Sequence, residues 1–292
     1  MTKPAPALFP VFSLLLAATM WGVIWYPLRL LEAAGLDGLW TTLIIYAAAL
    51  AIGLPLLWRR RAELQRQRGV LLVLALAAGW CNVAFILAVL EGTVVRVLLL
   101  FYLSPIWAVL LARIILGERL TAQARWVFLL AITGALVMLW DPAMGMPWPS
   151  EPGDWLAVSA GFGFALSNVT IRQLQAVSVP AKTVVSWTGV LAIAGAMLVF
   201  RDAVTWPAVG AGVWLGAVAL GWFGIVVMTL AVQYGVTHMP VHRSAVILLF
   251  ELVAGAVSAG LLTDEVVRPL EWIGGALIIA AAYWAARLQT HG

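Results

Sequence analysis

The chain has 292 residues, of which 64% are hydrophobic and only 10% are charged, and its formal net charge is +4. Soluble domains are about 45–50% apolar and about 25% charged, so this composition excludes a water-soluble globular fold. The apolar runs are about 20 residues long, which suits membrane-spanning helices and excludes the roughly 10-residue alternating strands of a membrane barrel. The sequence therefore predicts an all-α integral membrane protein.

Apolar runs separated by charged residues or by Pro and Gly predict ten transmembrane helices. The first run contains Trp21 and Trp25 and continues without a small-residue cleavage signal, so we expect it to be a retained span rather than a signal peptide. The predicted spans are 8–31, 38–58, 69–90, 93–116, 121–139, 153–174, 180–200, 210–235, 240–262 and 270–287.

Basic residues set the expected orientation of these spans. The segment between the second and third spans carries Arg59, Arg60, Arg61, Arg66 and Arg68. Short cytoplasmic loops of membrane proteins are enriched in Lys and Arg, so we place this segment in the cytoplasm and, by alternation, both termini as well. Topology thus accounts for the positive charge, and the sequence contains no nucleic-acid-binding motif.

A stretch rich in Pro and Gly, from Trp140 to Trp155, divides the chain into two halves of five spans, residues 1–147 and 148–292. Several residues recur between the halves at a nearly constant offset. They are Gly22 with Gly163, Gly79-Trp80 with Gly221-Trp222, and Ala88 with Ala231. Because five is an odd number, the halves must insert in opposite orientations. Inverted repeats that hold a substrate near the midplane are typical of secondary transporters, so we predict two inverted five-helix repeats around a central cavity.

The motifs at the ends and centres of these spans resemble a known family. They are Trp21-Gly22, Ser104-Pro105-Ile106, Leu116-Gly117-Glu118-Arg119-Leu120, Phe250-Glu251-Leu252 and Thr263-Asp264-Glu265. Over essentially the whole chain they resemble the EamA-type transporters of the drug/metabolite transporter (DMT) superfamily, and within it the YddG-like exporters. The resemblance implies a bacterial inner-membrane protein that exports aromatic and related neutral amino acids, and flat cationic xenobiotics, by alternating access. The second half departs from the family pattern, with Leu252 where proline is common and Thr263-Asp264 where Leu-Gly is common.

Aromatic residues predict the substrate site. Trp21, Trp80, Phe162 and Trp222 fall near the centres of spans one, three, six and eight, although Trp in membrane proteins usually gathers at the interfaces. If the halves are inverted copies, these rings share one depth and form the wall of an aromatic chamber. The alternative is that they only fill space between helices. Further candidates at similar depth are Trp25, Phe101 and Tyr102, together with the polar residues Asn82, Ser167 and Asn168.

Glu251 is the carboxylate predicted to lie near the centre of a span. A charge at that depth costs about 2.5–3.5 kcal/mol on insertion scales, so such residues usually face a cavity or carry a function. We hypothesise that Glu251 receives the ammonium group of an amino acid or titrates during transport. The alternative is a protonated side chain that hydrogen-bonds a neighbouring helix. Pro105, near the centre of span four, removes a backbone donor and predicts a kink beside the cavity.

The remaining polar residues favour structural roles. Glu118 and Glu265 mark the ends of spans four and nine, as headgroup-level charges or ion pairs. His238 and His242 flank Pro240 without a third ligand, so we expect no metal and no cofactor.

The sequence lacks HExxH, GxSxG and P-loop motifs, which argues against an enzyme. We expect a small-molecule substrate and the bilayer as partners, and the sequence is compatible with a monomer. The alternatives are export of a nucleoside, polar amino acid or drug, and a non-transporting membrane scaffold.

Overall fold

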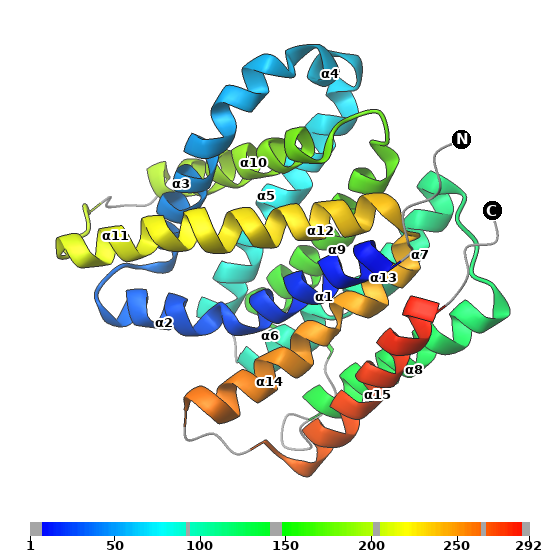
Figure 1. Ribbon diagram of the computed structural model, residues 1–292. Coiled ribbons are helices and arrows are strands. Elements are labelled where there is room, and N and C mark those ends of the chain that lie inside the picture. The colour runs from blue at the N-terminus through cyan, green and yellow to red at the C-terminus, as the bar shows by residue number, and fades with distance from the viewer. Residues whose placement is uncertain (1–7, 92–93, 141–147, 201–204, 264–266, 288–292) are drawn as a thin grey trace.

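The computed structural model describes residues 8–91, 94–140, 148–200, 205–263 and 267–287, and in these ranges every regular element is a helix (Figure 1). The elements are α1 (Leu8–Val23), α2 (Trp25–Ala33), α3 (Gly38–Arg59), α4 (Arg61–Arg66), α5 (Arg68–Glu91), α6 (Val94–Phe101), α7 (Ser104–Leu111), the π-helix η1 (Ala112–Leu116), α8 (Ala122–Leu139), α9 (Pro152–Gln173), α10 (Val179–Val199), α11 (Ala211–Ala219), the π-helix η3 (Leu220–Ile225), α12 (Val226–His238), α13 (Val241–Leu248), α14 (Phe250–Leu262) and α15 (Pro269–Arg287). The predicted boundary between the two halves, at residue 147, lies outside the described residues.

Nine helical segments among the described residues are long and apolar enough to cross a membrane. They coincide with nine of the ten predicted spans and confirm the multi-pass helical class. The predicted sixth span is α9, a helix of 22 residues that is less apolar than the others. Helices α5, α6, α7 and α12 pack around α9 and bury polar side chains such as Asn168 and Thr170. Because these helices enclose α9, its polar residues contact protein rather than lipid.

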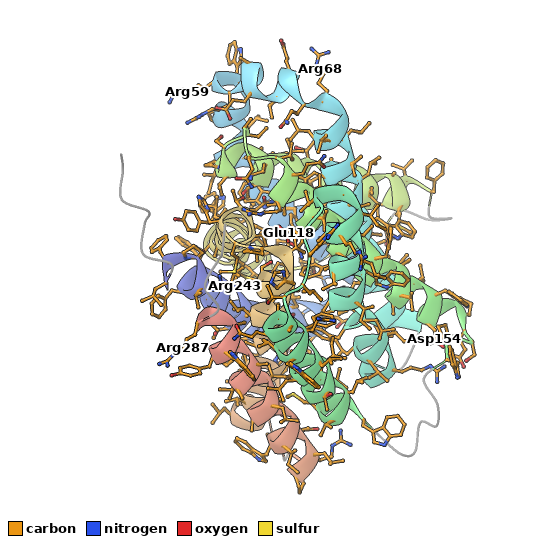
Figure 2. All side chains as sticks on the ribbon, turned by 90° about the vertical axis from the view of Figure 1, so that its right-hand side faces the viewer. Arg59, Arg68, Glu118, Asp154, Arg243 and Arg287 are labelled. Carbon is orange, nitrogen blue, oxygen red and sulfur yellow. The ribbon has the colours of Figure 1, made fainter. Side chains whose placement is uncertain are left out.

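One end of the bundle is formed by α4 and by the turns that follow α9 and α12 (Figure 1); we call it the α4 end. Arg59 and Arg68 lie together at this tip (Figure 2). The Glu63 carboxylate accepts a hydrogen bond from Arg60 at 2.5 Å and another from the backbone N–H of Ser178 at 3.0 Å, which ties α4 to the start of α10. The Arg60 hydrogen bond is the main reason that the pKa of Glu63 is lowered to about 2.

The opposite end, which we call the Trp40 end, holds a chain of tryptophan rings. The Trp40 indole donates a hydrogen bond to the Thr205 carbonyl at 3.1 Å and packs edge-on against Trp206, with 4.9 Å between ring centroids. Trp206 in turn stacks on Trp214 at 5.6 Å. These contacts join the start of α3 to α11. An amphipathic ring cluster at the end of a bundle is typical of the membrane–water interface.

Three spans are interrupted near their middles. The first breaks at Ile24, shortly before Pro27, and the fourth breaks at Tyr102 and Leu103, shortly before Pro105. Proline lacks a backbone N–H and displaces the carbonyl four residues earlier, which accounts for both breaks. The ninth span also breaks, at Leu249, although it lacks the proline.

Close helix contact at α5 and α10 depends on two glycines. A Cβ atom on Gly79 would lie 2.5 Å from the Gly189 carbonyl oxygen, and a Cβ on Gly189 would overlap the Ala75 carbonyl. Small residues let helices in a membrane approach closely, and dispersion contacts then replace the missing hydrophobic driving force. The packing of α5 on α10 therefore tolerates no side chain at either position.

We expect Gly189→Ala to destabilise the protein by about 1–3 kcal/mol, because the added methyl group forces α5 and α10 apart. Gly195→Ala on the same helix is the matched control, since its Cβ would meet only Leu43 Cδ2, at 4.0 Å. Thermal unfolding of both variants in detergent measures the difference. Equal midpoints for the two variants would show that the close approach is not needed for stability.

Candidate functional site

The centre of the bundle brings together two helix breaks and one carboxylate. Glu251 lies in the first turn of α14, directly after the break in the ninth span. Its side chain interacts with the hydroxyl of Tyr102, which lies at the break in the fourth span, and it is close enough to Cys81 of α5 to act on that thiol electrostatically. The structure thus places two predicted site residues, Glu251 and Tyr102, side by side. Cys81 carried no sequence signal beyond its apolar surroundings.

Each of these two broken spans presses its backbone against a glycine of another helix. A Cβ on Gly22 of α1 would lie 2.6 Å from the Glu251 carbonyl oxygen, and a Cβ on Gly161 of α9 would lie 2.7 Å from the Phe101 carbonyl oxygen. Phe101 is the residue whose carbonyl Pro105 leaves without its helical donor. The two contacts hold α1 against α14 and α9 against α6, on either side of Glu251.

Trp25 serves as an anchor in this arrangement. Its indole nitrogen donates a hydrogen bond to the Ser258 hydroxyl of α14 at 2.9 Å, and Ser258 lies 3.1 Å from the Gly22 carbonyl oxygen, to which it also donates. The predicted site residue Trp25 therefore has its polar group occupied by α14 in this conformation.

The other predicted rings occupy several environments. Trp80 donates a hydrogen bond to Ser159 at 3.2 Å, one turn of α9 away from Phe162, whose ring packs edge-on against Trp107 at 5.8 Å. Trp222 instead donates to the Ala48 carbonyl of α3 at 3.0 Å. Trp21 packs against an apolar cluster that includes residues of α3, α10 and α12, and Phe101 lies among the rings of Phe85, Tyr102 and Phe164. A chamber walled by Trp21, Trp80, Phe162 and Trp222 stays a prediction.

The predicted polar residues are engaged with protein groups. Asn82 accepts a hydrogen bond from the Tyr46 hydroxyl at 2.8 Å and donates to the Ala78 carbonyl at 2.9 Å. Ser167 donates to the Phe164 carbonyl at 3.0 Å, and Asn168 is buried within α9. Tyr46 was not predicted, because one tyrosine in a long apolar run gives no sign that it contacts a residue 36 positions away.

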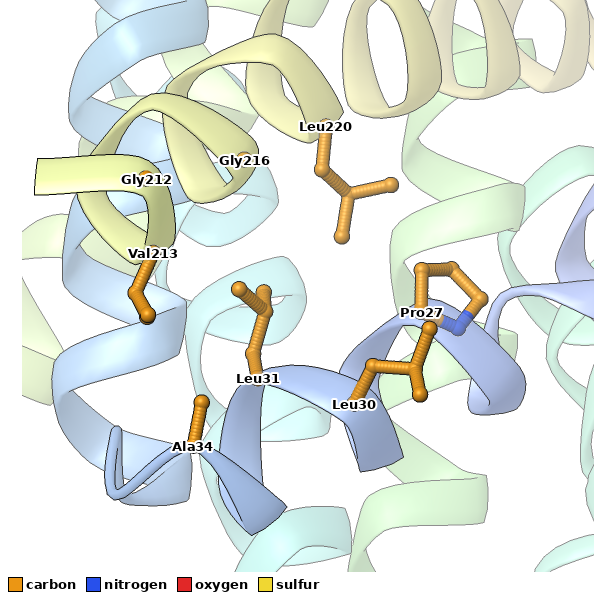
Figure 3. A pocket seen from close by; sticks show the side chains of 8 residues that line it. All are labelled: Pro27, Leu30, Leu31, Ala34, Gly212, Val213, Gly216 and Leu220. Atoms are coloured by element: carbon orange, nitrogen blue, oxygen red, sulfur yellow. The ribbon is translucent and has the colours of Figure 1, made fainter. Parts of the chain in front are cut away.

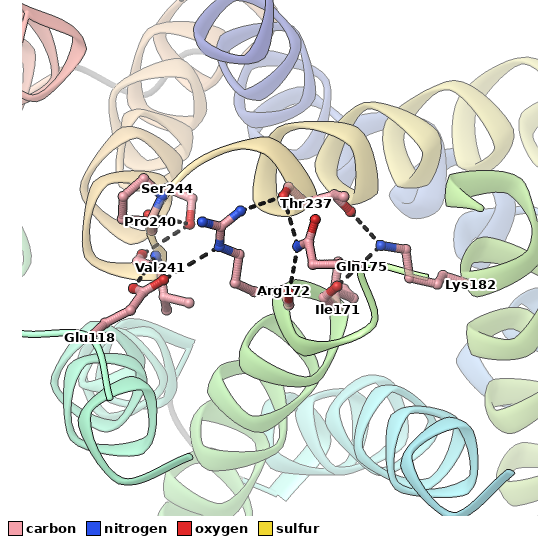
Figure 4. Close-up of polar contacts among 9 residues, drawn as sticks. All are labelled: Glu118, Ile171, Arg172, Gln175, Lys182, Thr237, Pro240, Val241 and Ser244. Carbon is pink, nitrogen blue, oxygen red and sulfur yellow. Dashed lines mark hydrogen bonds and ion pairs between the residues drawn. The ribbon is translucent and has the colours of Figure 1, made fainter. Parts of the chain in front are cut away.

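The sequence analysis did not predict a polar network that lies at the α4 end. We call it the Thr237 network (Figure 4); it consists of Glu118, Arg172, Gln175, Lys182, Thr237 and Val241. Lys182 is fully buried, and its ammonium group donates to the Thr237 hydroxyl at 2.6 Å and to the carbonyls of Ile171 and Leu174 at 3.1 and 3.2 Å. Arg172 and Gln175 both donate to the Thr237 carbonyl, at 2.7 and 3.1 Å. Arg172 and Gln175 therefore cap a carbonyl in the last turn of α12, and Lys182 binds the hydroxyl of the same residue.

Glu118 completes this network from the end of the fourth span. Its carboxylate pairs with Arg172 at 3.4 Å and accepts the backbone N–H of Val241, the first residue of α13, at 2.9 Å. Positive charge at the C-terminus of α12 and negative charge at the N-terminus of α13 both complement the helix dipoles. The network thus joins the fourth, sixth, seventh, eighth and ninth predicted spans at the α4 end. Glu265, the predicted counterpart of Glu118, lies outside the described residues.

A different ion pair connects the fourth and sixth predicted spans toward the Trp40 end, and Asp154 lies far from Arg59 and Arg68 in Figure 2. Arg96 of α6 donates to both oxygens of Asp154, at 2.7 and 2.8 Å, and Asp154 is only 1% exposed. Arg96 also donates to the Trp148 carbonyl at 2.5 Å. The pair therefore ties the first turn of α9 to the start of the fourth span, and the Trp148 contact adds the segment before α9.

We expect Asp154→Asn to destabilise the protein by about 2–4 kcal/mol, because it breaks a bidentate pair and leaves the Arg96 guanidinium poorly compensated. Arg60→Ala is the control, since both side chains of the Arg60–Glu63 pair are more exposed, at 46% and 26%, and an exposed pair contributes about 0–1 kcal/mol. Thermal unfolding in detergent distinguishes the two. A similar small change for both variants would contradict a structural role for the buried pair.

An apolar groove of about 280 Å³ lies between α2 and α11 at the Trp40 end (Figure 3). Its lining residues are Pro27, Leu30, Leu31, Ala34, Gly212, Val213, Gly216 and Leu220. The predicted site residues are not among them. The groove is instead a gap between the outer parts of the first and eighth predicted spans.

Comparisons with known proteins agree with this architecture. The model of the EamA-like transporter family matches the chain twice, over residues 8–140 and 151–287. The chain belongs to the EamA-like transporter family. Membership indicates a membrane protein that transports small molecules and supports a non-enzymatic role. A solved structure titled only "Crystal structure of protein" is similar in fold, with a TM-score of 0.71 at 20% identity over 96% of each chain. No curated protein matches the chain in sequence.

Proposed function

We propose that this EamA-like protein is a secondary transporter of the bacterial inner membrane that exports aromatic and related neutral amino acids by alternating access. The observation that carries the proposal is Glu251, a carboxylate at a helix break in the middle of the bundle, beside Tyr102 and surrounded by helices that carry aromatic rings. A carboxylate can bind the ammonium group of an amino acid, while aromatic rings suit an apolar or aromatic side chain.

An inverted repeat of residues 1–147 and 148–292, with α9 as the sixth of ten spans, is part of this proposal. Its support is the pattern of helix contacts, which is unchanged when each span of the first half is exchanged for its counterpart in the second. The contact of α5 with α9 corresponds to the contact of α12 with α1. The contact of α1 with α14 corresponds to the contacts of α9 with α6 and α7. The contact of α3 with α10 and the contact of α8 with α15 each join a span to its own counterpart, so the exchange leaves them unchanged. Such symmetry lets the two halves exchange conformations, which is the basis of alternating access.

The orientation follows from the arginines of the α4 end. Arg59, Arg60 and Arg68 flank or belong to the α4 segment, and the last turn of α15 carries Arg287 on the same side of the bundle. By the positive-inside rule the α4 end faces the cytoplasm, with both chain termini. The Trp40 end then faces outward, so export runs from the α4 end to the Trp40 end.

We expect saturable uptake of phenylalanine or tryptophan by proteoliposomes, and we expect Trp80→Ala to raise the KM about two- to tenfold, since an aromatic pair contributes about 0.5–1.5 kcal/mol beyond its buried area. Trp126→Ala on α8 is the control, because Trp126 is 67% exposed on the outside of the bundle. Radiolabelled phenylalanine, tryptophan, alanine and a nucleoside should be compared. Transport of the nucleoside alone would move the assignment to another metabolite class.

Glu251→Gln tests the carboxylate. We expect at least about tenfold slower amino-acid transport and a changed pH dependence, because the amide can neither titrate nor form an ion pair with an ammonium group. Glu32→Gln on α2, an exposed carboxyl, is the control. Initial rates should be measured with and without a pH gradient across the membrane. Rates and pH dependence identical to those of the native protein would remove Glu251 from the mechanism.

A further inference from the structure

The two ends of the bundle differ at positions that the internal repeat makes equivalent. The sequence separation between Gly22 and Gly163, applied to α2, makes Leu31 equivalent to Arg172 and Ala34 equivalent to Gln175. The separation between Gly79 and Gly221 likewise makes Val213 of α11 equivalent to Leu71 of α5, and Gly216 equivalent to Leu74. The α2–α11 groove at the Trp40 end is therefore the counterpart of the junction between the end of α9 and the start of α5 at the α4 end.

These counterparts are packed to different extents. At the α4 end, Leu71 and Leu74 are buried in the same apolar cluster as Leu174 and Val177, so side chains fill the junction. At the Trp40 end, Gly216 replaces the leucine, and a Cβ there would meet only Leu31 Cδ2, at 3.7 Å. The junction at this end contains the groove of about 280 Å³ instead.

The end of α9 and its counterpart on α2 also differ in their polar contacts. Arg172 and Gln175 hold the end of α9 to the Thr237 carbonyl, and Glu118 holds Arg172 and the start of α13. Their counterparts on α2, Leu31 and Ala34, are apolar and line the groove. Charge-assisted hydrogen bonds thus hold the end of α9 against α12 and α13, whereas α2 presents only apolar side chains at the equivalent positions.

We propose that the Thr237 network is the gate that closes the α4 end, and that the α2–α11 groove is the gap that closes when this gate opens. The proposal rests on the alternating-access function given above. A carrier of this kind is bistable, so loss of the Thr237 network shifts the population toward the state open at the α4 end. In that state α2 closes further on α11 and fills the groove, and Cys81 becomes accessible from the α4 side.

The experiment uses the single native cysteine, Cys81, and needs no substrate. A membrane-impermeant maleimide is applied to one side of sealed vesicles at a time. The side that carries the α4 end is identified with Ala62→Cys, an exposed α4 position, in a Cys81→Ser background. Arg172→Ala should raise the labelling rate of Cys81 from the α4 side about tenfold or more, since it removes two charge-assisted hydrogen bonds. The rate from the opposite side should not rise.

Arg125→Ala is the matched control, an exposed arginine of α8 near the same end. Equal labelling in the Arg172 and Arg125 variants would overturn the assignment of the gate. A rise from both sides would overturn it as well, because it would indicate general loosening of the bundle. The labelling of Cys81 involves no substrate, so it does not depend on the proposed amino-acid export. A failure of amino-acid transport and a failure of the gate therefore give separate results.

A second variant tests the link between the two ends. Gly216→Trp places a large ring in the groove, where the open space accepts it, and should keep α2 from closing on α11. In the Arg172→Ala background it should return α4-side labelling of Cys81 to within about twofold of the native rate. Leu215→Trp is the control, since Leu215 is 69% exposed and lies next to the groove position on the same helix. An unchanged high rate in the Gly216→Trp double variant would overturn the coupling between gate and groove.

Discussion

The bilayer core offers no hydrogen-bond partners, and most of the polar contacts described above are arranged around that constraint. Where a span breaks, the backbone near the break lies against a neighbouring helix: the Phe101 carbonyl against Gly161, and the Glu251 carbonyl against Gly22. Lys182 shows the same requirement for a charge, because all three of its donors are used by Ile171, Leu174 and Thr237. The polar contacts therefore define which helices must stay together.

Those contacts group the helices into units. The fourth and sixth spans are connected near both ends, by Arg96 with Asp154 and by Glu118 with Arg172, and they touch at Gly161 in between. The first and ninth spans are joined by Trp25, Ser258 and Gly22. Glu251 and Tyr102 lie where one unit meets the other. A solute bound at this point would contact both units, which is the geometry that a carrier needs to couple binding to a change of conformation.

The sequence predicted much of the class and organisation of the protein. Long apolar runs gave nine confirmed spans, which follow from local composition. The resemblance of motifs such as Ser104-Pro105-Ile106 and Phe250-Glu251-Leu252 to the EamA-type transporters is confirmed by the family match. The specific likeness to aromatic amino-acid exporters and the aromatic chamber remain predictions, because substrate choice depends on how a few side chains converge.

The sequence by itself determined that the chain is helical and lies in a membrane, because 64% apolar residues in runs of about 20 have no other stable arrangement. Only the tertiary structure decided the partners of the polar residues. Lys182 and Thr237 are 55 positions apart, and Glu118 and Val241 are 123 apart, so no local pattern connects them. It also decided where each end is fastened, by the Thr237 network at the α4 end and by the Arg96–Asp154 pair toward the Trp40 end, and it placed the groove between α2 and α11. At the α4 end Leu74 is buried in the apolar core, whereas Gly216, its counterpart at the Trp40 end, lines the groove.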